Sequence, residues 1–354
     1  MSVAGTVPTG SWGRQWKGWR SGIREALRNP IAAACRHVHG SPVFVVVYHT
    51  VCETNPDHIK NLYRPRTPRE FSADMEFLCR HFEPIDLPTL LKAVKGEEEI
   101  HRPSVLVTFD DGLREMAEVA MPILKGWGIK PALYVNLDFL DNKTLFFRQK
   151  ASLLAERLRR IGTDDVRWTT VSEILAMHGV AAHDPAAGVM RIAWDRRAVL
   201  DEVAHVLEFD EAEFLARTRP YLTRDEVRTL MAQGVAIGAH GFNHPNHRLL
   251  SPEERLAEVV GSTEATATMF GTGHRTFAFP FSDQGLPGDF FDALYAKGVD
   301  LTFGTSWPQK PTKARQIQRF CFETGPEPAS AQLTKRLIRS AGGNVLRGMR
   351  PAAA

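Results

Sequence analysis

The chain has 354 residues, of which 43% are hydrophobic and 24% charged, and these proportions exclude a disordered or collagen-like protein. The net charge is +5 in residues 1–40 and +5 in residues 331–354, which leaves −7 in between, so the acidic body argues against nucleic-acid binding. No apolar run approaches the roughly 18–20 residues of a membrane span, and the four cysteines form no Cys-x-x-Cys pair, which argues against a disulfide framework or a thiolate zinc site.

Residues 1–41 form a basic extension ahead of the first predicted strand. A helical pattern begins in this extension, and its apolar face carries Trp16, Trp19, Ile23 and Leu27. We favour a helix that packs on the body of the protein with its arginines in water, and a helix on an anionic membrane surface is the alternative. The apolar stretch 31–35 is too short and too late for a secretory signal, so we expect a cytoplasmic protein.

From residue 42 the sequence alternates between strand-like and helix-like segments. Four strands are predicted in the first part of the chain, at Val43–Tyr48, Pro84–Asp86, Ser104–Phe109 and Ala132–Asn136. Helices are predicted between these strands, at Pro68–His81, Pro88–Val94 and Met116–Trp127. The last of these helices should be kinked at Pro122. This repetition indicates a parallel sheet with right-handed crossovers, either open or closed into a barrel.

Residues 141–221 interrupt the alternation, because helical patterns occur there without a strand-like run. One helical face carries Phe147, Ala151, Leu154 and Leu158, and further helices are predicted at 171–178 and 196–207. We interpret this segment as a helical insertion rather than as an independent domain.

After the insertion the alternation of strands and helices resumes. Thr223 begins a helix, and Glu226, three residues later, completes a capping box. Strands are predicted at 235–239, 276–279, 301–303 and 317–320, with helices at 252–270 and 288–297. Near the C-terminus we expect a basic helix whose apolar side carries Leu333, Leu337 and Ile338.

Chemically active residues follow several of the predicted strands. They are His49, Asp110, Asp111, His240, His244, Pro280 and Phe281. In parallel β/α folds the carboxyl ends of the strands share one rim, and functional groups lie on that rim. Two carboxylates and three histidines on one rim are the side chains that a metal hydrolase requires.

The spacing of these residues suits a metal ion. His240 and His244 are four residues apart and can place two imidazoles on one ion, while one of the two adjacent aspartates supplies a third ligand. The other aspartate can then act as a general base, and Gly112 permits the tight turn that two adjacent acids need. Each motif alone is more often a surface histidine pair or a simple turn, but their occurrence at separate strand ends favours a metal site.

Three motifs resemble the signatures of the polysaccharide deacetylase family (carbohydrate esterase family 4, the NodB homology domain). Residues Thr108–Gly112 resemble the first signature, His240–Pro245 resemble the second, and Phe277–Phe281 resemble the third. The resemblance covers about 43–140 and 222–322.

The resemblance implies a distorted (β/α) barrel of about seven parallel strands. It implies a hydrolase of carbon–nitrogen bonds that removes N-acetyl groups from an amino-sugar glycan or glycan precursor. One divalent ion, zinc or else nickel, cobalt or manganese, would be bound by Asp111, His240 and His244. Asp110 matches the base, which takes a proton from metal-bound water as this water attacks the acetamide carbonyl. The metal and the backbone N–H of Phe281, which follows Pro280, would stabilise the oxyanion.

The sequence departs from the family pattern in three respects. Ala278 stands where many members have an arginine that orients the base, so another group must hold Asp110, and Arg319 is a candidate. Gly241 replaces the usual serine or threonine. The late Leu-x-His signature, which carries the catalytic acid, is missing. In a subgroup with an N-terminal Tyr-His motif this role moves to the first strand, which makes His49 the expected acid and a buried structural histidine the alternative.

We therefore expect an N-terminal extension at 1–41, a deacetylase-like domain at 42–325 and a basic helix and tail at 326–354. The expected partner is an N-acetylated glycan or a lipid-linked sugar, not a nucleic acid. A reversible contact of the two basic ends with an anionic membrane surface is the alternative to packing of the terminal helices on the body. Two other functions are considered. One is an amide hydrolase of the same superfamily that acts on a small molecule. The other is an inactive glycan-binding scaffold, which the intact set of acids and histidines argues against.

Overall fold

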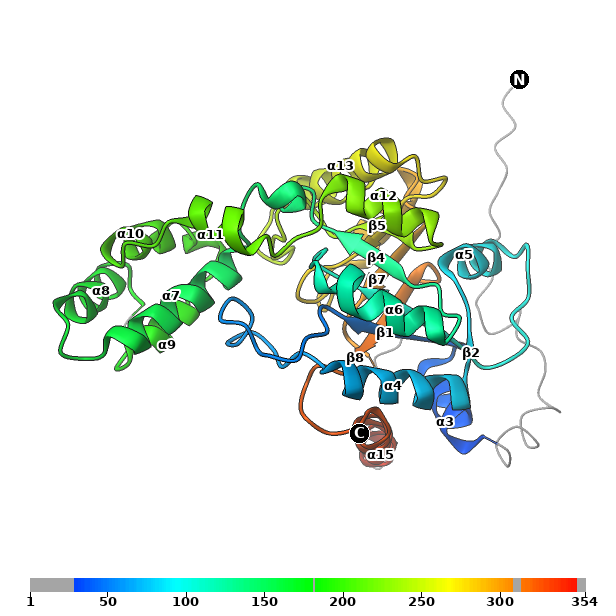
Figure 1. Cartoon of the computed structure of the whole chain (residues 1–354). Helices are drawn as coiled ribbons and strands as arrows, with labels where there is room; N and C mark the ends of the chain where they lie inside the picture. The colour runs from blue at the N-terminus through cyan, green and yellow to red at the C-terminus, as the bar shows by residue number, and fades with distance from the viewer. Residues whose placement is uncertain (1–28, 181, 308–312, 349–354) are drawn as a thin grey trace, which may run out of the picture.

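A closed ring of seven parallel strands forms the centre of the protein in the computed structural model, which describes residues 29–180, 182–307 and 313–348 (Figure 1). The strands are β1 (Val43–Tyr48), β3 (Ser104–Phe109), β4 (Ala132–Val135), β5 (Ala236–Ala239), β6 (Thr276–Ala278), β7 (Leu301–Gly304) and β8 (Gln316–Cys321). They are ordered β1-β8-β7-β6-β5-β4-β3, and the pairing of β1 with β3 closes the ring. The predicted barrel of about seven parallel strands is therefore confirmed.

The barrel is irregular. Six residue pairs join β1 to β3, whereas a single pair, Ala239 with Phe277, joins β5 to β6. The two-residue strand β2 (Glu83–Pro84) pairs with the start of β3 beside the ring. These uneven pairings are the distortion that the sequence resemblance implied.

The hydrophobic runs form strands because both of their faces are buried. All six residues of β1 and all six of β3 are buried, as in parallel sheets that are covered on both sides. Val43 and Val45 pack in one apolar cluster with Tyr134 of β4 and Phe303 of β7, on the inner side of the ring. Phe44 and Val46 pack in another cluster with the surrounding helices. The uninterrupted apolar sequence of β1 is therefore explained by the burial of both faces of the strand.

Helices surround the barrel. They are α3 (Pro30–His39), α4 (Pro68–His81), α5 (Leu87–Lys95), α6 (Met121–Gly126), α12 (Arg224–Ala232), α13 (Pro252–Phe270), α14 (Gly288–Ala296) and α15 (Ala329–Gly348). The predicted kink at Pro122 takes the form of a π-helical segment, η1 (Met116–Ala120), directly before α6. Proline lacks an N–H and its ring crowds the preceding turn, so the regular hydrogen-bond pattern is broken at this point.

The segment between β4 and α12 is helical and projects from one end of the barrel, on the left in Figure 1. Its helices are α7 (Phe147–Ile161), α8 (Val166–Met177), α9 (Pro185–Met190), α10 (Val199–Val206) and α11 (Glu211–Thr218), with short turns η2 (Leu140–Asn142) and η3 (Trp194–Arg196). An apolar cluster of its own holds the segment together and includes Ile59 from the loop after β1. The sequence did not predict the short helices α9 and α11.

The predicted capping box at the start of α12 is present. The side chain of Thr223 accepts a hydrogen bond from the N–H of Glu226, and the carboxylate of Glu226 accepts one from the N–H of Thr223. We expect Thr223→Ala to lower the free energy of unfolding by about 1 kcal/mol, because the N–H of Glu226 loses the hydroxyl that accepts its hydrogen bond. Urea-induced unfolding would measure this loss, and Thr223→Ser, which keeps the hydroxyl, should retain most of the stability. Equal losses in both variants would contradict the capping role.

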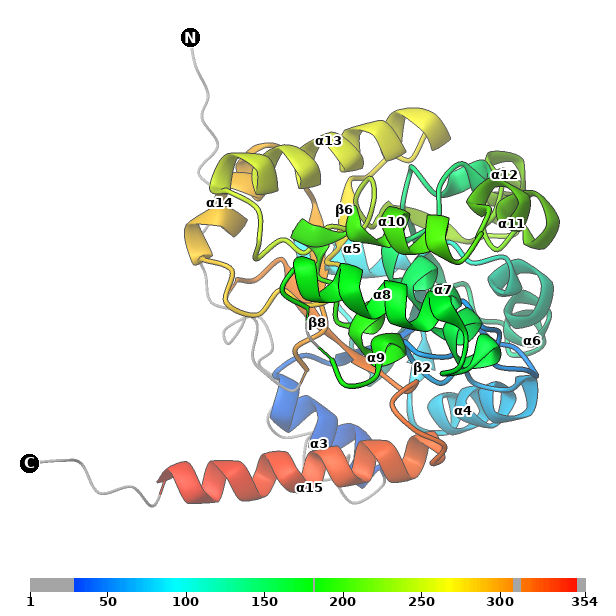
Figure 2. The same ribbon diagram turned by 90° about the vertical axis from the view of Figure 1, so that its left-hand side faces the viewer.

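The predicted N-terminal amphipathic helix lies outside the described residues. At the other end, α15 runs beside α3 and α4 (Figures 1 and 2), and Leu333 and Leu337 pack into the main apolar cluster. Ile338, in contrast, is 67% exposed. Most of the apolar side that we predicted for this helix is therefore used for packing on the body. Within the described part of the chain, no helix is long and apolar enough to span a membrane.

Candidate active site

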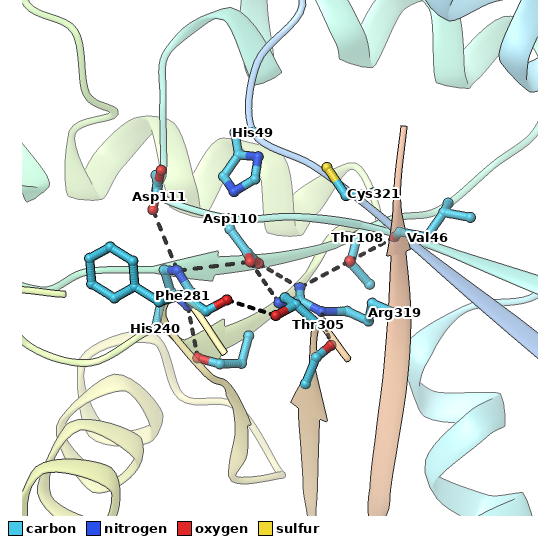
Figure 3. A network of polar contacts seen from close by, with 12 residues as sticks. Val46, His49, Thr108, Asp110, Asp111, His240, Phe281, Thr305, Arg319 and Cys321 are labelled. Atoms are coloured by element: carbon cyan, nitrogen blue, oxygen red, sulfur yellow. Dashed lines mark hydrogen bonds and ion pairs between the residues drawn. The ribbon is translucent and has the colours of Figure 1, made fainter. Parts of the chain in front are cut away.

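The residues predicted to carry the chemistry meet at the carboxyl ends of the barrel strands (Figure 3). His49 follows β1, Asp110 and Asp111 follow β3, and His240 follows β5. Because the strands are parallel, these ends lie on one rim, and residues far apart in sequence become neighbours.

Asp111, His240 and His244 form a compact group. The Nε2 atoms of both histidines lie 3.4 Å from Oδ1 of Asp111, and the three ligand atoms lie within 4.8 Å of one another. Bonds of 2.0–2.2 Å in a tetrahedral metal site place neighbouring ligand atoms about 3.4 Å apart. The spacing of this group therefore fits one divalent ion.

The surroundings of the three side chains also fit a metal ion. All three are buried, and Oδ1 of Asp111 has no hydrogen-bond partner among the described residues. The Nδ1 atom of His240 lies 2.8 Å from the carbonyl oxygen of Ala278, to which it donates when protonated, and this leaves Nε2 free as a ligand. A buried carboxylate oxygen without a donor is costly unless a cation binds it.

Burial controls the ionisation of these ligands. Burial, followed by the neighbouring His240, lowers the pKa of His244 well below its usual value, so the ring is in the neutral form that binds metals. Burial also raises the pKa of Asp111, although His49 and His240 oppose this effect. A cation bound to Asp111 would favour its ionised form.

The backbone at the site is held in an uncommon conformation. Asp111, His244 and Phe281 have positive φ angles of 70°, 61° and 57°, which non-glycine residues rarely adopt. Such conformations cost about 1–3 kcal/mol each and persist only where the surrounding structure enforces them. Gly112, which follows Asp111, also has a positive φ angle, of 69°. This agrees with the tight turn that was predicted directly after the two adjacent acids.

Arg319 holds the carboxylate of Asp110. Its two terminal nitrogens donate to the two carboxylate oxygens at 2.7 Å each, and one of them also donates to Oγ1 of Thr108 at 3.2 Å (Figure 3). Both partners of the ion pair are buried. Burial opposes ionisation of Asp110, but the charge and hydrogen bonds of Arg319, together with the neighbouring His240 and His49, outweigh this effect and lower the pKa of Asp110. Arg319, the candidate from the sequence, therefore holds Asp110 in this chain, which has alanine at position 278.

His49 pairs with a residue that the sequence analysis missed, Glu323. The Nδ1 atom of His49 lies 2.5 Å from Oε2 of Glu323, and the same carboxylate accepts hydrogen bonds from the N–H groups of His49 and Thr50. Burial lowers the pKa of His49, but the charge and hydrogen bond of Glu323, together with the charges of Asp111 and Asp110, outweigh this effect and raise the pKa to about 9. Glu323 belongs to no motif and reaches His49 only because β8 pairs with β1.

Phe281 presents its backbone at the mouth of the site. Its carbonyl accepts a hydrogen bond of 2.7 Å from Oγ1 of Thr305, which fixes the orientation of this segment after the buried Pro280 (Figure 3). Its ring is 43% exposed and lies 4.7 Å from the ring of His244, which also contacts Phe146 at the start of the helical segment. Aromatic rings therefore border the candidate metal-binding group.

The structure explains the glycine at position 241. Gly241 has φ +90°, and a Cβ atom there would lie 2.8 Å from Oε1 of Glu258. That oxygen accepts a hydrogen bond of 2.7 Å from the N–H of Phe242 and so supports the loop that carries the histidines. The usual serine or threonine of the family signature would be strained at this φ angle and would displace the Glu258 carboxylate from the N–H of Phe242.

Comparisons with known proteins agree with this description. The family model described as polysaccharide deacetylase matches residues 189–299, which include His240 and His244 but not the aspartate pair. No curated protein sequence matches the chain.

Three solved structures share the fold at low sequence identity. The Streptococcus pyogenes deacetylase PplD, solved with acetate, is 14% identical and has a TM-score of 0.51 over 83% of this chain and 97% of its own. IcaB from Ammonifex degensii is 15% identical, with a TM-score of 0.51 over 84% and 98%. A de-N-acetylase from Aggregatibacter actinomycetemcomitans is 15% identical, with a TM-score of 0.50 over 82% and 98%. The family match supports the predicted class of enzyme, a deacetylase-like hydrolase acting on carbon–nitrogen bonds, and the structures support its fold.

Proposed function

We propose that this protein is a metal-dependent hydrolase that removes N-acetyl groups from an amino-sugar glycan or glycan precursor. The observation that carries the proposal is the buried group of Asp111, His240 and His244 beside two differently tuned side chains, Asp110 and His49. Pairs of titratable groups whose pKa values are pushed apart are typical of acid–base catalysis. The match to the polysaccharide deacetylase family supports the choice of substrate class.

Zinc, or else nickel, cobalt or manganese, held by Asp111, His240 and His244 would polarise the acetamide carbonyl and make water a stronger nucleophile. Asp110 then takes a proton from the attacking water, and Arg319 keeps this carboxylate ionised and oriented. The backbone N–H of Phe281 donates to the developing oxyanion.

His49 acts as the acid in this proposal. The raised pKa keeps its ring protonated near neutral pH, so it can give a proton to the leaving amine as the carbon–nitrogen bond breaks. Glu323 holds the ring of His49 through Nδ1, so Nε2 on the other side of the ring is left to donate the proton. The products are acetate and the free amino sugar.

The direct test combines metal content with acetate release from N-acetylglucosamine oligomers. We expect about one bound ion per chain, acetate release from the oligomers, and loss of both after substitution of His240 by alanine. Release of acetate from small N-acetylated amides but not from the oligomers would indicate a small-molecule amide hydrolase. Binding of the oligomers by metal-loaded protein without acetate release would indicate the inactive scaffold.

Replacement of Glu323 by glutamine should change the pH dependence of the enzyme. With Glu323 present, the folded-state pKa of His49 is raised to about 9. The protonated form of His49 therefore exists at low pH, together with the stability that it contributes to the folded state. Both are lost as pH rises through about 9. Without the carboxylate charge this loss should occur at lower pH, near the ordinary histidine value of about 6.5. The basic limb of the kcat profile would measure the shift. An unchanged basic limb would show that His49 is not the acid or that Glu323 does not control it.

We further propose a cytoplasmic enzyme that acts on a lipid-linked precursor and contacts the anionic face of the inner membrane through its basic ends. The four free cysteines support a reducing compartment, and exposed Lys335, Ile338 and Arg339 on α15 support the contact. Co-sedimentation with anionic vesicles should be stronger than with neutral ones, decrease with salt, and weaken on deletion of residues 1–28. Equal sedimentation with both kinds of vesicle would contradict the membrane contact.

A further inference from the structure

A second cluster of metal-binding side chains lies beside the first. His49, Cys321 and Glu323 each offer one ligand atom, and these atoms lie within 4.8 Å of one another. The strand pairing builds this cluster, because Val47 of β1 pairs with Cys321 of β8. In Figure 3 the sulfur of Cys321 points toward the imidazole of His49. The sequence analysis did not predict this group, because its members share no motif.

The three side chains suit a borderline-soft divalent cation such as zinc. Imidazole, thiolate and carboxylate are all zinc ligands, and a thiolate disfavours magnesium and calcium. The sulfur of Cys321 lies 4.0 Å from Oε2 of Glu323, and Nδ1 of His49 lies 2.5 Å from the same oxygen. Ligand atoms around tetrahedral zinc lie about 3.3–3.7 Å apart, so adjustments of about 1 Å or less would form the site.

The cluster is both supported and accessible. The carboxylate of Glu323 is fully buried and is fixed by the backbone N–H groups of His49 and Thr50. The side chain of His49 is 24% exposed, which provides a route for an ion from solvent. A metal site needs such a fixed ligand and an entry path as well as suitable spacing.

We propose that His49, Cys321 and Glu323 form a second divalent-metal site, and that zinc bound there inhibits the enzyme. Binding displaces the proton of the Cys321 thiol and the proton between His49 and Glu323. Zinc bound at Nδ1 leaves the His49 ring as a neutral imidazole. The remaining Nε2–H of such a ring is a far weaker acid than that of an imidazolium, so His49 could no longer protonate a leaving amine efficiently. The binding rests on the cluster alone, whereas the inhibition rests on the function proposed above.

Titration of the metal-free protein with Co²⁺ tests the binding directly. The group of Asp111, His240 and His244 contains no thiol, so one equivalent bound there should give visible bands without a sulfur-to-cobalt charge-transfer band. A further equivalent bound with Cys321 should give that near-ultraviolet band. In Cys321→Ser the band should disappear and the second ion should bind at least about tenfold more weakly. The matched control is Cys79→Ser, which replaces a half-buried cysteine of α4 and should behave as the wild type.

Activity in excess zinc tests the inhibition. Wild-type acetate release should fall as the second ion binds, and Cys321→Ser should keep its activity under the same conditions. Should the serine variant not fold, Cys321→Ala gives the same comparison. A missing charge-transfer band in the wild type, or an equal band in Cys321→Ser, would overturn the second site. A charge-transfer band without inhibition by zinc would support the second site but overturn the inhibition. A lack of acetate release from both the wild type and the variants would count against the proposed function instead.

Discussion

Replacement of Asp110 by asparagine should lower the rate of acetate release by about 10²–10⁴-fold, the usual contribution of a general base. Asparagine has nearly the same shape as aspartate, so the strand end and the neighbouring Asp111 should keep their positions. The amide cannot take a proton from water, however, and it offers Arg319 only one acceptor oxygen in place of two. The loss should therefore appear in kcat, measured by acetate release.

Metal content separates this effect from damage to the metal site. The Asp110→Asn protein should still bind one ion, whereas His240→Ala should not, because His240 is one of the three convergent side chains. Asp138→Asn, which changes a partly buried acid outside this group, is the matched control and should keep its rate. A metal-loaded Asp110→Asn enzyme with the wild-type rate would show that another residue is the base.

Replacement of Arg319 by methionine should lower the free energy of unfolding by about 3–5 kcal/mol, because it leaves the buried carboxylate of Asp110 without its partner. The stability that this pair contributes depends on an ionised Asp110, whose folded-state pKa is lowered. This contribution is present above the unfolded-state value of about 3.9 and is lost as pH falls through the lower folded-state value. Urea-induced unfolding should therefore show the largest difference between wild type and Arg319→Met near neutral pH.

Two further variants identify the cause of the destabilisation. Arg319→Lys keeps the charge but not the paired hydrogen bonds, so it should be intermediate in stability. The double variant Asp110→Asn with Arg319→Met has no unpaired charge and should be more stable than Arg319→Met alone. If the double variant were as unstable as the single one, the loss would come from packing against Tyr134 and Phe303 rather than from the ion pair.

The barrel could be predicted from the sequence because each of its strands corresponds to a short, continuous sequence pattern. Val43–Tyr48 is a continuous run of aliphatic and aromatic residues, and Ser104–Phe109 is apolar except at Ser104 and Thr108. Such runs fit strands that are buried on both faces. The helices α9 and α11 were missed because they have six and eight residues, too few for a clear helical periodicity.

The rim residues were predictable for a related reason. Asp110, Asp111 and His240 each follow a recognisable strand, and parallel strands place their carboxyl ends together. The partners of the proposed catalytic groups were harder to find. Arg319 lies within a strand and Glu323 just after it, so their roles depend on which strands are neighbours in the closed ring. That information is not local in the sequence.

The pairing of β1 with β8 joins the beginning of the barrel to its end. Asp110 and His49 belong to the first third of the chain, but the residues that charge-balance and orient them, Arg319 and Glu323, are synthesised more than 200 residues later. Contacts this distant in sequence form late in folding, because a long loop must close first. A nascent chain would carry its proposed base and acid without their partners until β8 docks, so the catalytic apparatus is completed only when the last strand closes the ring.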